Sequence, residues 1–369
     1  MSPSAIYLDA NATTPLSRQV MAEMTPALAE LFANPSSVHK PGQDARALVD
    51  TARERCSRTL GCAPREIIFT SGGTESDALG ILGSQPRKVV TSAVEHPAVL
   101  GACAKAPECM RVPVLASGEL DLEALRRALP SASLCSIMAA NNETGVIFPL
   151  REVAALCHDA GVPLHVDAVQ AAGKIPLDFP WDSISLSAHK IEGPKGAGLL
   201  AVRGMKLEGL QRGGHQEQGR RAGTENVAGI VGMSAALHRA SQAQPLLEPR
   251  LRALRDKLEA AAREIPGAHV AGRAASRICN TLNVAFEGCE GETLLAALDL
   301  EGIAVSTGSA CSSGTLEPSP VLLAMGYSSE LARGAIRFSL WSGNTEEQID
   351  RACRVLPGVV SRARGSFKT

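Results

Sequence analysis

The chain has 369 residues, which at roughly 150 residues per domain predicts two domains. Its composition is 45% hydrophobic and 20% charged, with only 3% aromatic residues, so we expect a large core built mainly from aliphatic side chains. With 37 basic and 38 acidic side chains, the net charge of −1 excludes a general attraction to nucleic acid or anionic membranes.

The N-terminus and the cysteines predict a cytoplasmic protein. Residues 1–10 have neither a cationic n-region nor an apolar h-region, and no apolar run approaches the roughly 18 residues of a membrane span. The ten cysteines contain no C-x-x-C pair, which argues against a zinc ribbon or a thioredoxin-type site. Most of them are therefore expected to be buried, unreactive thiols.

Strands and helices are predicted to alternate as far as about residue 225. Short apolar runs predict buried strands at 66–70, 88–91, 133–139 and 163–167. Apolar residues at helical spacing predict helices at 43–60, 74–82, 122–129 and 150–160, and Gly61 and Gly161 are expected to end two of them. This alternation indicates an α/β domain with a mainly parallel sheet.

The pattern changes after residue 225. Two long helices separated by Gln244 and Pro245 are predicted within 226–264. Strands at 280–286 and 334–340, with a helix at 291–300 between them, then suggest a smaller α+β unit.

A glycine-containing turn follows the strand predicted at 66–70. It reads TSGGTES over residues 70–76 and leads into a helix. Gly72 and Gly73 allow a ligand to approach the backbone, and the helix N-terminus offers free N–H groups to an anion. The segment matches neither the P-loop nor the G-x-G-x-x-G pattern, so an NTP or dinucleotide site is disfavoured. These residues alone fit a phosphate site and an ordinary strand-to-helix turn equally well.

An acid ends the strand predicted at 163–167. Asp167 lies in the sequence HVDAVQ, where a carboxylate in an apolar run is costly unless it has a partner. A protonated ring nitrogen on a cofactor would be such a partner, and an Asp that caps the next turn is the alternative. A metal site with His165 is disfavoured because no third ligand has a suitable spacing, and no metal is expected.

A lysine follows another short strand, in the sequence SLSAHKIEGPKG over residues 185–196. Lys190 would be a nucleophile towards aldehydes only where burial lowers its pKa. Ser187 and His189 flank it as hydrogen-bonding groups. For a lone lysine at a strand end, a solvated surface residue is the default interpretation.

In this order, the blocks around residues 70–76, 165–170 and 185–196 resemble the pyridoxal-phosphate enzymes of the class V aminotransferase family, and most closely the cysteine desulfurases of NifS/IscS type. Further matching blocks are YLD and NATT near the N-terminus, NPSS at 34–37, EHP at 95–97, NNETG at 141–145, GRRAGTEN at 219–226, SAC at 309–311 and IRFSL at 336–340.

The resemblance implies a fold type I transferase of class α/β. A large cofactor-binding domain at 15–258 would contain a mainly parallel seven-stranded sheet. A smaller α+β domain, formed by 1–14 and 259–369, would carry the loop with Cys311.

The resemblance also implies how the cofactor, pyridoxal 5'-phosphate, is held. Lys190 would bind it covalently, Asp167 would keep its ring nitrogen protonated and Gln170 would bond its phenolic oxygen. His96 would stack on the ring and move protons, although a histidine that merely starts a helix before Pro97 is the alternative. The phosphate would be bound by Gly73, Thr74, Ser187 and His189, with Thr224 reaching across from the neighbouring subunit of a homodimer.

The substrate implied by the resemblance is L-cysteine. Asn142 would contact both cofactor and substrate, and Arg337 would bind the substrate carboxylate through its planar fork. Without the other motifs, a solvated edge-strand arginine would be the default interpretation of Arg337.

Cys311 is the exceptional thiol. The surrounding segment 306–319 is rich in Ser, Thr and Gly, which predicts a mobile surface loop rather than a core position. By the resemblance, its thiolate would take the substrate's sulfur as a persulfide and release alanine, and it could transiently ligate an iron–sulfur cluster. The sulfur would then pass to an acceptor protein, an iron–sulfur scaffold or a tRNA-thiolation enzyme, with no direct contact to nucleic acid or membrane.

The sequence departs from the family pattern at three places. Ala10 replaces a more common Asn, and Trp341 replaces a usual Gly, where it is expected to reshape the wall beside Arg337. The chain stops at Thr369, where IscS-type enzymes carry a longer tail, so we expect docking of their scaffold to differ.

Two other functions fit the same blocks. An aminotransferase or a selenocysteine/cysteine lyase would use the same lysine and aspartate, and only Cys311 with its loop distinguishes them. A non-catalytic scaffold protein is the third interpretation, and the complete set of Lys190, Asp167 and His96 disfavours it.

Overall fold

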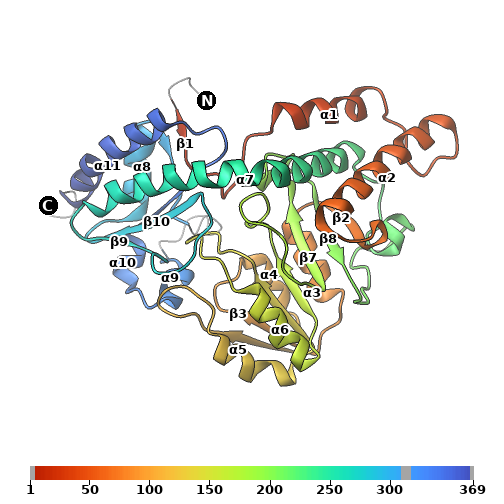
Figure 1. The fold of residues 1–369 in the computed structure, drawn as a ribbon, viewed down its shortest axis with the longest axis horizontal. Helices are drawn as coiled ribbons and strands as arrows, with labels where there is room; N and C mark the ends of the chain where they lie inside the picture. Colours follow the sequence, from red (N-terminus) through yellow and green to blue (C-terminus); the bar gives the residue numbers. More distant parts are fainter. Residues whose placement is uncertain (1–4, 309–316, 366–369) are drawn as a thin grey trace.

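A seven-stranded sheet forms the centre of the larger part of the molecule in the computed structural model, which describes residues 5–308 and 317–365 (Figure 1). Its strand order is β2-β8-β7-β6-β5-β3-β4. The strands are β2 (Ile67–Thr70), β3 (Lys88–Ser92), β4 (Glu108–Val112), β5 (Leu134–Met138), β6 (Leu164–Asp167), β7 (Ser183–Ser187) and β8 (Gly198–Val202). Only β8 runs antiparallel to its neighbours, β2 and β7, so the predicted α/β class with a mainly parallel sheet is confirmed.

Helices precede or connect these strands, and α2, α3, α5 and α6 lie where the apolar spacing predicted helices, whereas α1 and α4 were not predicted. They are α1 (Arg18–Ala29), α2 (Lys40–Leu60), α3 (Gly73–Leu82), α4 (Pro97–Cys103), α5 (Leu122–Ala128) and α6 (Leu150–Ala160). Gly61 and Gly161 end α2 and α6 at φ of 64° and 65°, a left-handed conformation that glycine adopts without strain. The two predicted helix stops are therefore confirmed.

The prediction of two helices within 226–264 is wrong. A single helix, α7 (Val227–Arg263), runs through Pro245 and Pro249. Each proline removes one backbone donor, but both are exposed, so water can satisfy the carbonyls that they leave free. The ends of the helix are held by packing, since α7 contacts α1, α2 and α11 (Glu346–Gly365).

The smaller part of the molecule contains a three-stranded antiparallel sheet in the order β12-β10-β9. Its strands are β9 (Ala268–Val270), β10 (Thr281–Phe286) and β12 (Ala335–Ser339), and its helices are α8 (Gly291–Leu300), α9 (Pro320–Ala324), α10 (Ser329–Arg333) and α11. The N-terminal strand β1 (Ile6–Tyr7) pairs in parallel with β11 (Ile303–Ala304). The predicted strands at 280–286 and 334–340 and the helix at 291–300 are confirmed.

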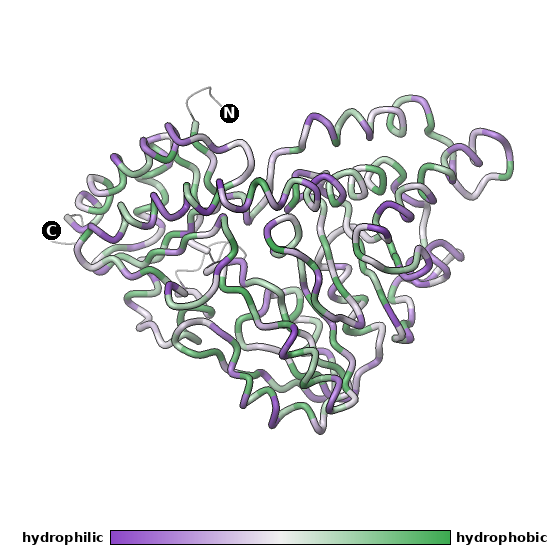
Figure 2. Tube along the Cα trace, in the orientation of Figure 1, coloured by the Kyte–Doolittle hydropathy of each residue, from purple (hydrophilic) through white to green (hydrophobic). Residues whose placement is uncertain are grey.

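Helix α7 contributes to two hydrophobic cores and runs across the molecule between them (Figure 1). Its first turns, including Met233 and Leu237, pack with α1 and α2, whereas Leu254 and Leu258 pack with β10 and α11. In Figure 2 the outer turns of helices such as α5 and α11 are hydrophilic. In the part of the chain that the structure describes, no helix has both the length and the apolarity needed to cross a membrane.

The core of the smaller part predicts a stability difference between two leucines of α7. Leu258 is fully buried, and its replacement by Ala should lower the free energy of unfolding by about 2–5 kcal/mol, because a cavity remains. Leu246 is 81% exposed, so Leu246→Ala should change it by less than about 0.5 kcal/mol. Denaturant melts of both variants measure this, and equal effects would contradict the assignment of the core.

Candidate active site

A cavity of about 230 Å³ lies beyond the carboxyl ends of the parallel strands. Ligands bind at this edge of α/β sheets because the strands deliver their following residues to one place. The predicted site residues that line the cavity are Gly73, Thr74, His96, Asn142, Asp167, Gln170, Ser187, His189 and Lys190. The structure thus brings together residues that come from five separate stretches of the chain.

Asp167 is the last residue of β6 and is buried. One carboxylate oxygen, Oδ1, accepts a hydrogen bond of 2.9 Å from the Val169 N–H. Burial raises the pKa of Asp167 to about 7, and the neighbouring Asp77 adds to the rise, whereas His96 and His165 oppose it. A cation placed beside this carboxylate would favour its charged form.

Asp77 and His165 form a polar pair behind Asp167 that the sequence analysis did not predict. The Asp77 Oδ1 and His165 Nε2 atoms are 3.3 Å apart, and His165 Nδ1 lies 2.8 Å from the Ser183 hydroxyl. Burial raises the pKa of Asp77 to about 7 and lowers that of His165 to about 4, so the histidine is neutral at pH 7. The sequence did offer a signal for this pair, because Asp77 lies one turn into the helix that follows the glycine-containing turn.

His96 is held at the N-terminus of α4. Its Nδ1 accepts a hydrogen bond of 3.1 Å from the Ala98 N–H, so in the neutral ring the proton resides on Nε2. Burial lowers the pKa of His96 and the positive charge of Lys190 lowers it further, although Asp167 acts in the opposite direction. A neutral imidazole with a proton on Nε2 is suited to exchanging protons with a ligand in the cavity.

Lys190 ends the short helical turn Ala188–Lys190 after β7, and its ammonium group reaches the N-terminal segment. Its Nζ donates to the carbonyl oxygens of Asn11 and Ala12, at 2.6 and 2.8 Å. The amide Nε2 of Gln170 shares the Asn11 carbonyl, at 3.0 Å. Lysine and glutamine are therefore fixed by the same backbone oxygen at the cavity wall.

Another lysine, Lys174, is buried and binds the side-chain oxygen of Gln170. Lys174 Nζ donates to Gln170 Oε1 at 2.9 Å, and burial lowers the pKa of Lys174 to about 7. Lys174 also lines a separate cavity of about 50 Å³ with Lys190 and Trp341. The sequence analysis missed Lys174, although a lysine within the apolar run AVQAAGKIPL was a usable signal.

The residues at the start of α3 fit a phosphate group. A Cβ atom at Gly73 would lie 2.8 Å from Val169 Cγ2, so only glycine leaves room for the backbone there. Among the residues that the structure describes, the buried Ser187 hydroxyl has no hydrogen-bond partner, and it lies close to Gly72 of this turn. The N–H groups at the start of α3 and an orphaned hydroxyl form a suitable cradle for an anion.

His189 completes this side of the cavity. Its Nδ1 lies 3.1 Å from the Thr13 hydroxyl. Burial lowers its pKa to about 4, and the charges of Lys190 and Lys195 lower it further. The ring is therefore neutral at pH 7 and interacts with an anion as a hydrogen-bonding group rather than as a cation.

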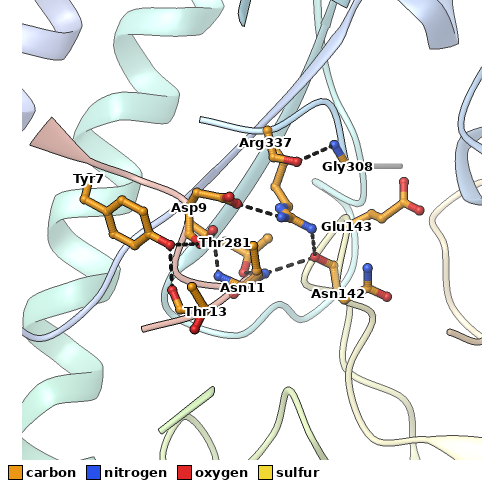
Figure 3. Close-up of polar contacts among 12 residues, drawn as sticks. Tyr7, Asp9, Asn11, Thr13, Asn142, Glu143, Thr281, Gly308 and Arg337 are labelled. Atoms are coloured by element: carbon orange, nitrogen blue, oxygen red, sulfur yellow. Dashed lines mark hydrogen bonds and ion pairs between the residues drawn. The ribbon is translucent and has the colours of Figure 1, made fainter. Parts of the chain in front are cut away.

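Arg337 lies on β12 between two other segments (Figure 3). Its Nη2 donates to Asp9 Oδ1 at 2.8 Å, and its Nη1 donates to the Asn142 carbonyl at 3.1 Å. The side chain is buried, yet its Nε has no hydrogen-bond partner within the described residues. The sequence analysis gave Asp9 no role, although it lies in the quoted YLD block.

Two predicted site residues that the structure describes, Arg337 and Thr224, do not line this cavity. Arg337 adjoins it through its hydrogen bond to the carbonyl of Asn142, which is a lining residue. Thr224 is exposed and follows Arg221, whose Nε donates to Glu75 Oε1 at 2.9 Å beside the start of α3. Cys311 lies outside the described residues. The roles assigned to these residues, and to the residues that line the cavity, stay predictions.

Comparisons with known proteins agree with this geometry. The chain matches the family Aminotransferase class-V over residues 6–352. A cysteine desulfurase of Gluconacetobacter diazotrophicus is 47% identical, covering 98% of this chain and 94% of the relative, and the cysteine desulfurase NifS of Azotobacter vinelandii is 46% identical, covering 97% and 93%. The chain belongs to the class-V aminotransferase family, in its NifS/IscS-like branch.

Solved structures agree with the assignment. A NifS-like protein, 36% identical, superposes with a TM-score of 0.91 over 97% of this chain and all of the other. SspA in complex with cysteine, 31% identical, superposes with a TM-score of 0.77 over 91% of this chain and 98% of the other. The predicted family and fold type are confirmed.

The raised pKa of Asp167 predicts a pH-dependent stability in cofactor-free protein. Between pH 3.8, the ordinary pKa of an aspartate, and about pH 7, Asp167 keeps a proton in the folded protein that it has released in the unfolded chain. The contribution of Asp167 to the free energy of unfolding should therefore fall as pH rises through this window, by at most about 1.4 kcal/mol per pH unit. Above pH 7 it should be constant.

Urea melts of wild type and Asp167→Asn from pH 4 to 8 measure this contribution as a difference. Asp178→Asn, at an acid whose side chain is 70% exposed, is the control and should leave the pH profile unchanged. A difference between wild type and Asp167→Asn that does not vary with pH would contradict the burial argument.

Proposed function

We infer that this protein is a pyridoxal-phosphate-dependent cysteine desulfurase, which converts L-cysteine to L-alanine and transfers the sulfur to an acceptor. The observation that carries this conclusion is that Lys190, Asp167 and His96 line one cavity. The near full-length similarity to cysteine desulfurases supports it.

The cavity supports a defined arrangement of the cofactor. When bound, pyridoxal phosphate accepts the electron pair released at the substrate's Cα. Asp167 would hold the ring nitrogen in its protonated form, Gln170 would bond the phenolic oxygen and Lys190 would hold the aldehyde carbon. Gly73, Thr74, Ser187 and His189 would bind the phosphate, which the orphaned Ser187 hydroxyl supports.

Arg337 and Asn142 would bind the substrate carboxylate. Within the described residues Arg337 Nε has no hydrogen-bond partner, which leaves a donor for that anion, and Asp9, which binds Nη2, helps to fix the plane of the guanidinium. His96, neutral at pH 7, would move a proton at Nε2 beside the reacting carbon, and Lys190 would act as the second proton carrier.

Cys311 would take the sulfur. Its thiolate attacks the substrate's sulfur, the C–S bond breaks, and the electron pair stays on the carbon, which takes up a proton to become alanine. An S–S bond forms at the same time, so the persulfide and alanine balance without an external oxidant. A thiol of the acceptor then removes the outer sulfur by exchange.

The proposal also covers how the protein assembles and which protein accepts its sulfur. The exposure of Thr224 in the monomer supports a homodimer in which it completes the partner's phosphate site. The two hydrophobic cores support a division into two domains, which we place at 15–258 and at 1–14 with 259–369. Leu254 and Leu258 of α7 nevertheless pack into the core of the smaller one. The acceptor would be an iron–sulfur scaffold or a tRNA-thiolation enzyme in the cytoplasm, where Cys311 could transiently ligate a cluster.

Replacement of Lys190 by Ala should abolish covalent cofactor attachment and turnover. Borohydride reduction followed by peptide mass spectrometry should place the cofactor's mass on the Lys190 peptide of the wild type and on no lysine of the variant. Lys195→Ala, at an exposed lysine nearby, is the control and should retain both. Cofactor attached to another lysine in Lys190→Ala would refute the assignment.

Replacement of Cys311 by Ser should separate substrate binding from sulfur transfer. Added L-cysteine should still shift the cofactor's absorbance, because Arg337 and Asn142 are unchanged, but alanine release should be lost because a hydroxyl is hardly ionised at neutral pH. Cys109→Ser, at an exposed cysteine, should behave as wild type. Near-normal alanine formation by Cys311→Ser would instead indicate a lyase.

A further inference from the structure

The side-chain amide of Gln170 is held at both of its polar atoms. Its Nε2 donates to the Asn11 carbonyl at 3.0 Å, and its Oε1 accepts from Lys174 Nζ at 2.9 Å. A backbone carbonyl can only accept and a lysine ammonium can only donate, so these two partners allow one orientation of the amide. Gln170 also lines the cavity of about 230 Å³. The group that it can offer to a ligand there is therefore the second N–H of Nε2, a donor.

Asn11 is a rigid anchor for one end of this amide. Its N–H donates to the Ser339 hydroxyl at 2.9 Å, and its Nδ2 donates to the Asn142 carbonyl at 3.0 Å (Figure 3). Its Oδ1 accepts from Asn280 Nδ2 at 3.1 Å. A glutamine held at Asn11 alone would still be able to pivot about that one hydrogen bond. The contact with Lys174 supplies the second fixed point and so determines the direction of the free N–H.

Packing alone does not explain a lysine at position 174. Lys174 is 7% exposed, and burial lowers its pKa to about 7. The charges of Lys190 and Arg337 lower that pKa further, whereas Cys279 opposes the fall. An apolar side chain of similar volume would avoid the cost of burying a charge. The adjoining cavity of about 50 Å³ has room for water, which can bind the ammonium protons that Gln170 does not use.

We propose that Lys174 is a positioning residue that keeps the Gln170 amide turned with an N–H towards the phenolic oxygen of the cofactor. This inference rests on the proposed function, in which Gln170 bonds that oxygen. When the phenolic oxygen is ionised, an N–H that faces it forms a charge-assisted hydrogen bond, whereas the amide oxygen would repel it. Lys174 acts through Gln170 and has no other part in the proposed chemistry.

Binding of two ligands to cofactor-free protein tests this role without any turnover. Lys174→Met removes the donor and keeps a side chain of similar shape. Equilibrium dialysis should show that it binds pyridoxal 5'-phosphate about tenfold more weakly than the wild type, the effect of one hydrogen bond to a charged group. The analogue 3-deoxypyridoxal 5'-phosphate lacks the phenolic oxygen, so Lys174→Met should bind it as tightly as the wild type does.

Lys105→Met, at an exposed lysine, is the matched control and should bind both ligands like the wild type. Equal losses of affinity for the two ligands in Lys174→Met would overturn the proposal, because a general disturbance of the cavity would then explain them. Should Lys174→Met fail to fold, Lys174→Gln takes its place in the same comparison, since its side chain stays polar but ends one atom short of Nζ.

A double-variant cycle tests whether Lys174 acts through Gln170. Gln170→Met alone should weaken the binding of pyridoxal phosphate but not of the analogue. Adding Lys174→Met to Gln170→Met should then weaken it no further, because the amide that the lysine orients is already gone. Losses that add in the double variant would show that Lys174 acts independently of Gln170, and the proposal would be wrong.

The two proposals fail in different ways. If the affinities respond as expected but L-cysteine yields no alanine, the positioning role stands and the proposed reaction is wrong. If alanine is formed but Lys174→Met binds pyridoxal phosphate as tightly as the wild type, the positioning role is wrong and the proposed function stands. A wild type that does not bind pyridoxal phosphate would refute both.

Discussion

Burial of ionisable side chains at the carboxyl edge of the seven-stranded sheet is the constraint on which the rest of the site depends. Asp167 and Asp77 have pKa values raised to about 7 and Glu95 has one raised to about 8, while burial lowers the pKa of His96 and His165. Such groups are costly in an apolar interior unless a charge of opposite sign lies beside them. A protonated ring nitrogen at Asp167 would supply that charge, so the same burial that destabilises the cofactor-free protein favours cofactor binding.

Arg337 connects parts of the chain that are far apart in the sequence and that would together form the substrate site. It pairs with Asp9 near the N-terminus and with the Asn142 carbonyl in the NNETG block, and its own strand binds Ser306. These contacts bring three of the matching blocks together, since the buried guanidinium on β12 has partners in the N-terminal segment and in the turn after β5. The same turn holds Glu143, whose Oε2 accepts a hydrogen bond of 2.5 Å from the Ser319 hydroxyl.

The sequence predicted the features that depend on local patterns. Alternating apolar runs predicted the parallel sheet, and Lys190, Asp167 and Gly73 each stand at the end of a strand or within three residues of it, where ligands bind in α/β sheets. Their roles were implied by the family resemblance and stay predictions. The long helix α7 was predicted as two, because a proline ends most helices and only tertiary packing shows that this one continues. Asp77, Lys174 and Glu143 were missed for a related reason: their partners are distant in sequence or on the next turn, and the value of a buried polar group depends on those partners.

The central claim is that sulfur leaves L-cysteine as a persulfide on Cys311. The most direct test is to mix wild-type protein with L-cysteine, stop the reaction without reductant, and analyse all cysteine-containing peptides by mass spectrometry. The account predicts the added mass of one sulfur atom on the peptide that contains Cys311, in an amount that matches the alanine formed in the first turnover. Extra sulfur on another cysteine instead, or alanine formed with no sulfur retained by the protein, would contradict it.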